Sequence, residues 1–178
     1  VPAPPSARAG FFRKAEMPMH EADHIKSLFN SKAAVWDRKE PTDPRLVDTM
    51  LFLADLHPGM RILDVGCGTG FLIPYLLRTN PSEVVGIDFA ENMIAAAKKK
   101  INDPRVTLLC CDLFDLPAHG NYDCCILFNT FPHIPDPHAL TAHLEQMLRP
   151  GGRLVISHSQ GRKLGKDTPV APAMPARG

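Results

Sequence analysis

Apolar residues follow two patterns that alternate along the chain. Short, nearly continuous apolar runs are typical of strands buried on both faces of a parallel sheet, and apolar residues at helical spacing indicate amphipathic helices. The predicted strands lie at about 60–65, 83–88, 106–111, 122–128 and 154–157, and the predicted helices at about 20–36, 43–54, 70–78, 90–100 and 138–148. This alternation predicts an α/β protein in which helices cover both faces of a parallel sheet. Because crossovers between parallel strands are right-handed, all strands are expected to end at the same edge.

The length of 178 residues indicates a single domain, and its two ends differ in composition from the rest. Residues 1–18 are rich in Pro and Ala, which predicts a disordered N-terminal arm. Residues 19–160 carry the strand and helix pattern and form the predicted domain. Residues 161–178 are rich in Pro and Gly, which predicts an irregular tail.

The composition of the chain limits the kinds of partner that the protein is expected to bind and the cellular compartment in which it is expected. A hydrophobic share of 44% is enough for a packed core, and a net charge of +1 favours neither nucleic acid nor an anionic membrane. No apolar run approaches the ~20 residues of a membrane span. Neighbouring cysteines on a strand point to opposite faces, so the adjacent pairs Cys110-Cys111 and Cys124-Cys125 are poor disulfides and poor metal chelates. Buried thiols in a reducing cytoplasm are therefore expected.

A glycine-rich turn follows the first predicted strand. The chain reads I-L-D-V-G-C-G-T-G from Ile62, so the strand ends in Asp64 and Val65, and Gly66, Gly68 and Gly70 come next. Glycines at such a turn let a ligand approach the backbone, and the amides of a following helix offer free hydrogen-bond donors. The turn therefore predicts a ligand site.

The kind of ligand is indicated by the second strand and by the glycine spacing. The second strand ends in Asp88, whose carboxylate is well placed to accept both hydroxyls of a ribose. Phe71 follows Gly70, so the glycines run G-x-G-x-G and not in the G-x-G-x-x-G pattern of dinucleotide-binding proteins. No Gly-Lys-Ser/Thr follows the turn, which also argues against a phosphate loop. A nucleoside-bearing cofactor is expected, and a nicotinamide oxidoreductase is disfavoured.

Five motifs in order resemble the class I S-adenosylmethionine-dependent methyltransferases, within them the small-molecule branch that includes enzymes of the ubiquinone/menaquinone-biosynthesis type. They are L-D-V-G-C-G-T-G (63–70), V-G-I-D-F-A-E-N-M-I (85–94), C-D-L-F-D-L-P (111–117), Y-D-C-C-I-L-F-N-T (122–130) and L-R-P-G-G-R-L-V-I-S (148–157). The opening F-N-S-K-A-A-V-W-D (29–37) resembles that branch too. The resemblance implies a Rossmann-like doubly wound parallel sheet. It also implies methyl transfer from S-adenosyl-L-methionine to a small-molecule acceptor.

The resemblance further implies a cofactor site at the strand ends. Its members would be Trp36, Asp64, Gly66, Cys67, Gly68, Gly70, Asp88, Phe89, Met93, Asp112, Leu113 and Asn129. Within this set Asp64 would orient the ammonium end of the cofactor, Asp88 would bind the ribose, and Asp112 would accept from the adenine amino group. Core packing is the competing interpretation for Trp36, and capping of a loop for Asn129.

A catalytic base is needed only where the acceptor carries a proton. His133 and His158 lie near the expected active edge and are the candidates, since imidazole accepts protons near neutral pH. A solvent-facing or helix-capping histidine is the competing interpretation for both, so the catalytic residue is left unassigned.

A second motif matches the signature of a different class of protein. His20 to His24 reads H-E-A-D-H, which matches the H-E-x-x-H signature of zinc proteases. The stretch lacks the apolar residues of a buried metalloprotease helix, and no third ligand is recognisable downstream. No metal site is expected.

The end of the chain departs from the family pattern. Class I methyltransferases usually continue past the fifth strand with a helix and an antiparallel strand pair, but about twenty residues follow Ser157 here, with Pro169, Pro172 and Pro175 among them. The chain is therefore expected to be truncated, with the fifth strand at an open apolar edge that favours association into a homo-oligomer. A non-catalytic module that holds the cofactor or a partner is the alternative function.

Overall fold

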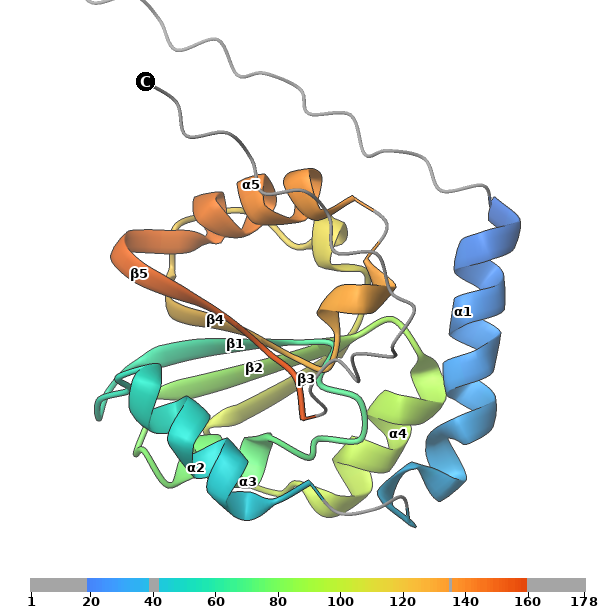
Figure 1. Cartoon of the computed structure of the whole chain (residues 1–178), viewed down its shortest axis with the longest axis horizontal. Coiled ribbons are helices and arrows are strands. Elements are labelled where there is room, and N and C mark those ends of the chain that lie inside the picture. The colour runs from blue at the N-terminus through green and yellow to red at the C-terminus, as the bar shows by residue number, and fades with distance from the viewer. Residues whose placement is uncertain (1–18, 39–41, 135, 160–178) are drawn as a thin grey trace, which may run out of the picture.

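The computed structural model describes residues 19–38, 42–134 and 136–159. The predicted arm (1–18) and tail (161–178) lie outside these residues. In chain order the elements are α1 (Met19–Lys32), η1 (Ala33–Arg38), α2 (Pro44–Leu53), β1 (Arg61–Val65), α3 (Ile73–Leu77), β2 (Glu83–Asp88), α4 (Glu91–Lys100), β3 (Val106–Cys110), η2 (Leu113–Asp115), β4 (Tyr122–Phe128), η3 (Phe131–His133), α5 (Pro137–Met147) and β5 (Leu148–Ser157), where η marks a 3₁₀ helix (Figure 1).

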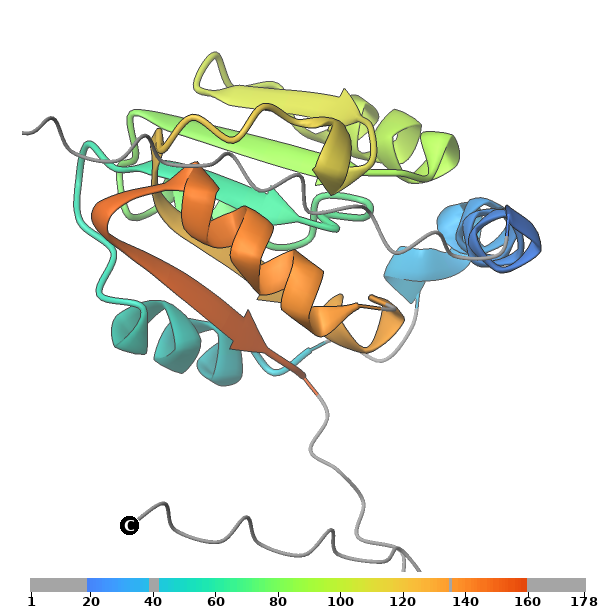
Figure 2. The same cartoon turned by 90° about the horizontal axis from the view of Figure 1, so that it is seen from above.

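The strands form one parallel sheet in the order β3-β2-β1-β4-β5. The predicted Rossmann-like architecture is confirmed, and so is the position of the fifth strand at an edge. Helices α2, α3 and α4 lie on one side of the sheet and α5 on the other (Figure 1). In both views the strand arrowheads point toward the side on which α1 stands (Figures 1 and 2). Helix α1 therefore lies beyond the carboxyl edge.

Buried side chains alternate between two apolar layers. Ile62 and Leu63, neighbours on β1, belong to different layers, and so do Cys124 and Cys125 on β4. Helices α2 and α3 complete the first layer, and α5 completes the second. The expected opposite orientation of neighbouring cysteines is thus confirmed, and all five thiols are free. Cys110 is exposed because β3 is an edge strand, and Cys111 directly after it is only half-buried, so the expectation that the thiols are buried is wrong at both positions.

Two predicted helix starts are confirmed by their caps. The Asp43 carboxylate accepts the backbone N–H of Arg45 ahead of α2. The Asp136 carboxylate accepts the N–H groups of His138 and Ala139 ahead of α5. Each Asp precedes a Pro, which suits the first helical turn because that turn leaves N–H groups without intrahelical partners.

Three predicted boundaries are wrong. The first helix ends at Lys32 and continues as the 3₁₀ helix η1. Helix α3 begins at Ile73 and not at Gly70, whose φ of +82° excludes it from a right-handed helix. Strand β5 begins at Leu148, which pairs with Tyr122 before a register shift. The pattern of apolar residues alone does not mark the residue at which a helix or strand begins or ends.

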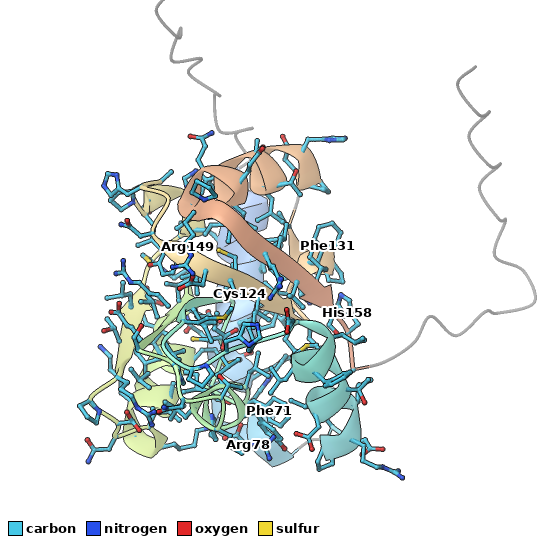
Figure 3. The ribbon with its side chains drawn as sticks, turned by 90° about the vertical axis from the view of Figure 1, so that its left-hand side faces the viewer. Phe71, Arg78, Cys124, Phe131, Arg149 and His158 are labelled. Carbon is cyan, nitrogen blue, oxygen red and sulfur yellow. The ribbon has the colours of Figure 1, made fainter. Side chains whose placement is uncertain are left out.

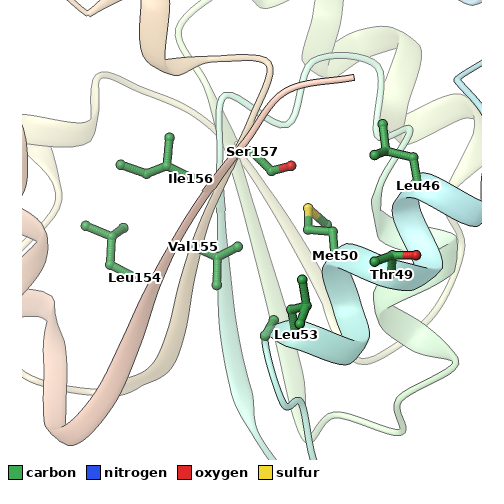
Figure 4. Close-up of a pocket in the computed structure, with 9 residues that line it drawn as sticks. Leu46, Thr49, Met50, Leu53, Leu154, Val155, Ile156 and Ser157 are labelled. Carbon is green, nitrogen blue, oxygen red and sulfur yellow. The ribbon is translucent and has the colours of Figure 1, made fainter. Parts of the chain in front are cut away.

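The outer edge of β5, which pairs with no strand in the described ranges, borders an apolar groove. It has a volume of about 380 Å³ and runs between α2 and β5, with Leu46, Met50, Leu53, Val155 and Ile156 among its lining residues (Figure 4). Leu53 and Ile156 remain well exposed. Among the described residues, no helix has the length and apolar character needed to cross a membrane. The same part of the chain contains no group of three or more metal-ligating side chains, although the side chains of His20 and Glu21 lie outside it.

Asp123 ties three strands together at the end opposite to the strand tips. Its carboxylate is 5% exposed, accepts the backbone N–H of Arg61 at 2.7 Å, and forms an ion pair with Arg149. Arg61 begins β1 and Arg149 lies near the start of β5. One buried carboxylate thus holds β1, β4 and β5 in register.

Replacing Asp123 with Ala is expected to lower the free energy of unfolding by about 2 to 4 kcal/mol, because a buried N–H and a guanidinium lose their common acceptor. Urea-induced unfolding measures the change. Glu145→Gln, at an exposed position of α5, is the control and should change the free energy of unfolding by less than about 0.5 kcal/mol. An Asp123→Ala variant as stable as the wild type would contradict this role.

Candidate cofactor site

The strand order arranges five polar side chains along one edge of the sheet. Asp112 follows β3, Asp88 ends β2, Asp64 lies next to the end of β1, Asn129 follows β4 and His158 follows β5. Because neighbouring parallel strands lie about 4.8 Å apart, the spatial order is the strand order 3-2-1-4-5. Figure 3 shows His158 at the end of β5. The carboxylates therefore occupy one half of the edge and the amide and imidazole the other.

The glycines of the turn after β1 have different steric surroundings. All have positive φ, at +69° for Gly66, +54° for Gly68 and +82° for Gly70. A Cβ on Gly66 would lie 2.5 Å from Thr130 Oγ1, and that hydroxyl donates to the Gly66 carbonyl at 3.3 Å. A Cβ on Gly68 would meet no atom of the described residues within 4 Å. Gly66 thus admits the loop after β4, whereas Gly68 leaves open space beside the backbone.

Cys67 lies within the turn but faces the protein. It is 6% exposed, and its Sγ lies 3.1 Å from where a Cβ on Gly86 would stand. Burial and the charges of Asp64 and Asp88 raise the pKa of this thiol far above its usual range, so it stays protonated. Only its backbone is available to a ligand.

The Asp88 carboxylate is already bonded on both oxygens. Oδ2 accepts the N–H of Gly68 at 3.0 Å, and Oδ1 accepts the N–H of Ala90 at 2.8 Å. Burial raises the pKa of Asp88, and these two hydrogen bonds act against that rise. Asp88 therefore joins the glycine turn to the start of α4, and each of its oxygens can accept a further hydrogen bond, while its contact with a ribose stays a prediction.

Asp64 is the electrostatically exceptional group. It is 1% exposed, and its Oδ2 is buried without a hydrogen-bond partner among the described residues. Burial, together with the negative charge of Asp88, raises the pKa of Asp64 to about 7. An unpaired buried carboxylate is costly, so the site is complementary to a positive charge or a hydrogen-bond donor.

The residues expected around adenine are largely packed. Met93 is 1% exposed and belongs to a small cluster with Ala33 and Ala90, against which Phe29 and Trp36 pack. Core packing is therefore enough to explain the presence of Met93 at this position. Contact of Trp36 with the cofactor stays a prediction.

The turn after β3 is fixed from two sides. The Asp112 carboxylate accepts the N–H of Phe114 at 3.0 Å and so caps η2. His143 Nε2 lies 3.2 Å from the carbonyl oxygen of Leu113, a residue that is 6% exposed. Phe89, half-buried at the end of β2, meets the edge of Phe29 at a centroid distance of 6.2 Å. Contacts of Phe89, Asp112 and Leu113 with adenine stay predictions.

Asn129 organises the other half of the edge. It has a φ of +61°, and its Oδ1 accepts the backbone N–H of Ser159 at 2.7 Å while its Nδ2 donates to the Ser159 hydroxyl at 3.0 Å. Asn tolerates this left-handed conformation better than most residues. Its side chain holds the chain after β5, as the loop-capping interpretation expects.

The two histidines lie on this half as well. His158 Nε2 is buried without a hydrogen-bond partner in the described part of the chain. His133 meets the edge of Phe29 at a centroid distance of 5.2 Å, and burial, His158 and Lys32 lower its pKa. His133 is therefore neutral at neutral pH and can accept a proton there.

One group of site residues escaped the sequence-based prediction. Thr69, 1% exposed within the glycine turn, donates to Asp37 Oδ1 at 2.6 Å, and Lys100 donates to Asp37 Oδ2 at 2.7 Å. The only hint in the sequence was that Asp37 follows Trp36 in the segment that resembles the family. Contacts across 32 and 63 residues leave no local signal.

Comparison with known proteins agrees with this architecture. Residues 63–156 match a family model described as a methyltransferase domain. A malonyl-[acyl-carrier protein] O-methyltransferase from Priestia megaterium is 29% identical over 137 residues, which cover 75% of this chain and 50% of that protein. A protein of the same name from Acetivibrio thermocellus is 33% identical over 136 residues, covering 75% and 48%. The chain thus spans about half the length of the curated relatives it matches.

Solved structures share the fold. A SAM-dependent methyltransferase from Aquifex aeolicus has a TM-score of 0.62 and 27% identity, covering 71% of each chain. A SAM-dependent methyltransferase from Geobacter sulfurreducens in complex with S-adenosyl-L-homocysteine has a TM-score of 0.61 and 22% identity, covering 71% of this chain and 53% of that one. With more than half of its length matched by the family model, the chain belongs to the methyltransferase domain family, within the S-adenosylmethionine-dependent class.

Gly66→Ala is expected to cost about 2 to 4 kcal/mol of folding free energy, because the methyl group adds a clash with Thr130 to the strain of a positive φ. Gly59→Ala is the matched control. Its φ is +83° and no atom of the described residues lies within 4 Å of the new Cβ, so only backbone strain of about 1 kcal/mol is expected. Equal losses in urea unfolding would show that close approach to Thr130 is not the reason for Gly66.

Asp64→Asn is expected to abolish a pH dependence of stability. The pKa of Asp64 lies above that of an Asp in the unfolded chain, so its stabilising contribution is present at low pH and is lost as the pH rises through about 7. Between about pH 5 and about pH 8 the wild type should lose about 2 to 3 kcal/mol relative to the variant. Urea unfolding of both proteins at each pH measures this. Parallel pH profiles would refute the raised pKa, and any constant cost of the Asn side chain cancels in the comparison.

Proposed function

We propose that this chain binds S-adenosyl-L-methionine at the carboxyl edge of its sheet and transfers the methyl group to a small-molecule acceptor. The observation that carries the proposal is Asp64, a buried carboxylate whose Oδ2 has no hydrogen-bond partner among the described residues, beside the open backbone at Gly68. The cofactor is cationic at its sulfonium and ammonium groups and carries a ribose diol. Its charge and hydroxyls match the two buried carboxylates on β1 and β2.

Each part of the cofactor has candidate partners within the proposed domain, residues 19–160. Asp64 and the open backbone at Gly68 would hold the methionine portion, and Asp88 would accept the ribose hydroxyls. The adenine would lie toward the end of β3, against Phe89 and the turn at Asp112. This order follows the strand order, so the methyl group would face the tips of β4 and β5.

The cofactor supplies an electrophilic methyl group, and the protein supplies orientation and exclusion of water. The acceptor side would be formed by Asn129, His133 and His158. A neutral imidazole there suits an acceptor whose nucleophilic atom carries a proton. A carboxylate acceptor, such as the names of the malonyl-[acyl-carrier protein] relatives imply for those proteins, needs no base.

A second candidate function is a module that holds the cofactor without transferring its methyl group. The β5 edge beside the acceptor side favours it, since this edge pairs with no strand in the part of the chain that the structure describes and Ile156 is 41% exposed there. That edge also supports association with a second copy of the chain. The free thiols support a cytoplasmic location, and the net charge of +1 argues against a nucleic-acid partner.

Asp88→Ala is expected to weaken the binding of S-adenosyl-L-homocysteine at least about 100-fold, because two ribose hydroxyls lose a charged acceptor worth about 1.5 kcal/mol each. Isothermal titration calorimetry measures the affinity. Asp48→Ala, an exposed position on α2, is the control and should bind like the wild type.

The calorimetric result separates the candidates. Absence of binding by the folded wild type, or equal affinity of the Asp88→Ala variant, would refute the cofactor site. Binding without transfer of a labelled methyl group from S-adenosyl-L-methionine to any of a panel of small acceptors, malonyl-CoA included, would support the non-catalytic alternative.

A further inference from the structure

Asp37 lies at a junction of three segments that are distant in sequence. It belongs to η1, its Oδ1 accepts the Thr69 hydroxyl of the glycine turn at 2.6 Å, and its Oδ2 accepts Lys100 Nζ at the end of α4 at 2.7 Å. Partial burial alone would raise the pKa of Asp37, but the hydrogen bonds from Lys100 and Thr69 outweigh it and lower that pKa. The carboxylate is therefore charged at neutral pH and uses both of its oxygens.

Thr69 connects this junction directly to the backbone that would contact the cofactor. It stands between Gly68 and Gly70, both with positive φ, and it is 1% exposed. On the other side of the same turn the Gly68 N–H is bound by Asp88. The turn is thus held by two carboxylates, Asp88 from β2 and Asp37 from the N-terminal segment. Since glycines allow many backbone conformations, such fixed points determine which one the turn adopts.

The N-terminal segment, which we call the cap (α1 and η1, Met19–Arg38), is attached elsewhere mainly by exposed polar contacts. Lys26 and Asn30 both bind Glu91, and Asn30 also accepts the N–H of Asn92. In Figures 1 and 2 α1 stands beside α4, away from the sheet. Exposed ion pairs and hydrogen bonds contribute little to stability, because water competes for the same groups.

The apolar part of the cap attachment is small and lies beside the predicted adenine and ribose positions. Phe29 and Trp36 pack on Ala33, Ala90 and Met93. Phe29 also contacts Phe89, the residue directly after Asp88. The cap therefore covers the end of β2. Asp37 connects the cap to the glycine turn through the part-buried hydrogen bond from Thr69, and to α4 through an exposed ion pair with Lys100.

We propose that Asp37 is a positioning residue that clamps the cap onto the glycine turn, so that cap closure and cofactor retention are coupled. The clamp has two bonds, from Thr69 and from Lys100. When both are made, the turn is held in its binding conformation and the cap lies over the end of β2. The inference rests on the proposed cofactor site, but the clamp itself can be tested without a ligand.

Trp36, the only tryptophan in the chain, precedes Asp37 and reports on the cap. Without ligand, Asp37→Ala is expected to make Trp36 fluorescence more accessible to acrylamide quenching, because the cap is released. Lys99→Met, at an exposed position next to Lys100, is the matched control and should quench like the wild type. Unchanged quenching in a folded Asp37→Ala protein would overturn the clamp, whether or not the wild type binds the cofactor.

Stopped-flow fluorescence with S-adenosyl-L-homocysteine tests the coupling. Asp37→Ala should raise the dissociation rate constant about tenfold, the effect of one lost charged hydrogen bond. Thr69→Val removes the donor without changing the size of the side chain, and its effect should not add to that of Asp37→Ala. Weaker binding with an unchanged dissociation rate, or additive effects of the two substitutions, would overturn the coupling. A wild type that fails to bind would refute the proposed function and the coupling together, while the quenching comparison would still decide the clamp.

Discussion

The parallel pairing of β1 with β2 on one side and β4 on the other is the constraint on which the site depends. Both faces of these strands are buried, so a slip of one residue would exchange the two apolar layers. The register therefore brings Asp64 opposite Gly86, one strand away from Asp88. At the other end of the sheet Asp123 holds β1, β4 and β5 together, because Arg61 and Arg149 meet its carboxylate. The positions of the residues at the carboxyl ends of the strands are thus fixed by the packing of the two apolar layers and by the contacts of the buried Asp123 carboxylate.

The electrostatics of the carboxyl edge work against stability. Asp64 is buried beside another carboxylate and has no partner among the described residues, an arrangement that a folded chain alone would not favour. The fold tolerates it because Ile62, Leu63 and Val65, its apolar neighbours on β1, are buried in the core. Such unfavourable groups concentrate where a ligand completes the interactions, which is why Asp64 is the strongest indication of a cationic ligand.

The edge has two halves with different chemistry. The half at β1, β2 and β3 carries carboxylates and borders the cap, and the half at β4 and β5 carries Asn129, His133 and His158. No strand among the described residues pairs with the outer side of β5, and an apolar groove separates it from α2. The chain belongs to the methyltransferase domain family and spans about half the length of the curated relatives that match it.

The sequence by itself determined the fold class, the five strands, two helix caps and the place of the glycine turn. Each of these depends on local patterns: apolar periodicity, Asp before Pro, and glycines after an apolar run. It failed at Gly70, where a positive φ delays α3, and at Leu148, where pairing with Tyr122 lengthens β5. Only the tertiary structure decided that Gly66 makes room for Thr130, that Asp64 lacks a partner, and that Asp37 binds Thr69 and Lys100. Contacts and burial of this kind join residues far apart in the chain, so they exist only once the sheet has brought its strand tips and the cap together.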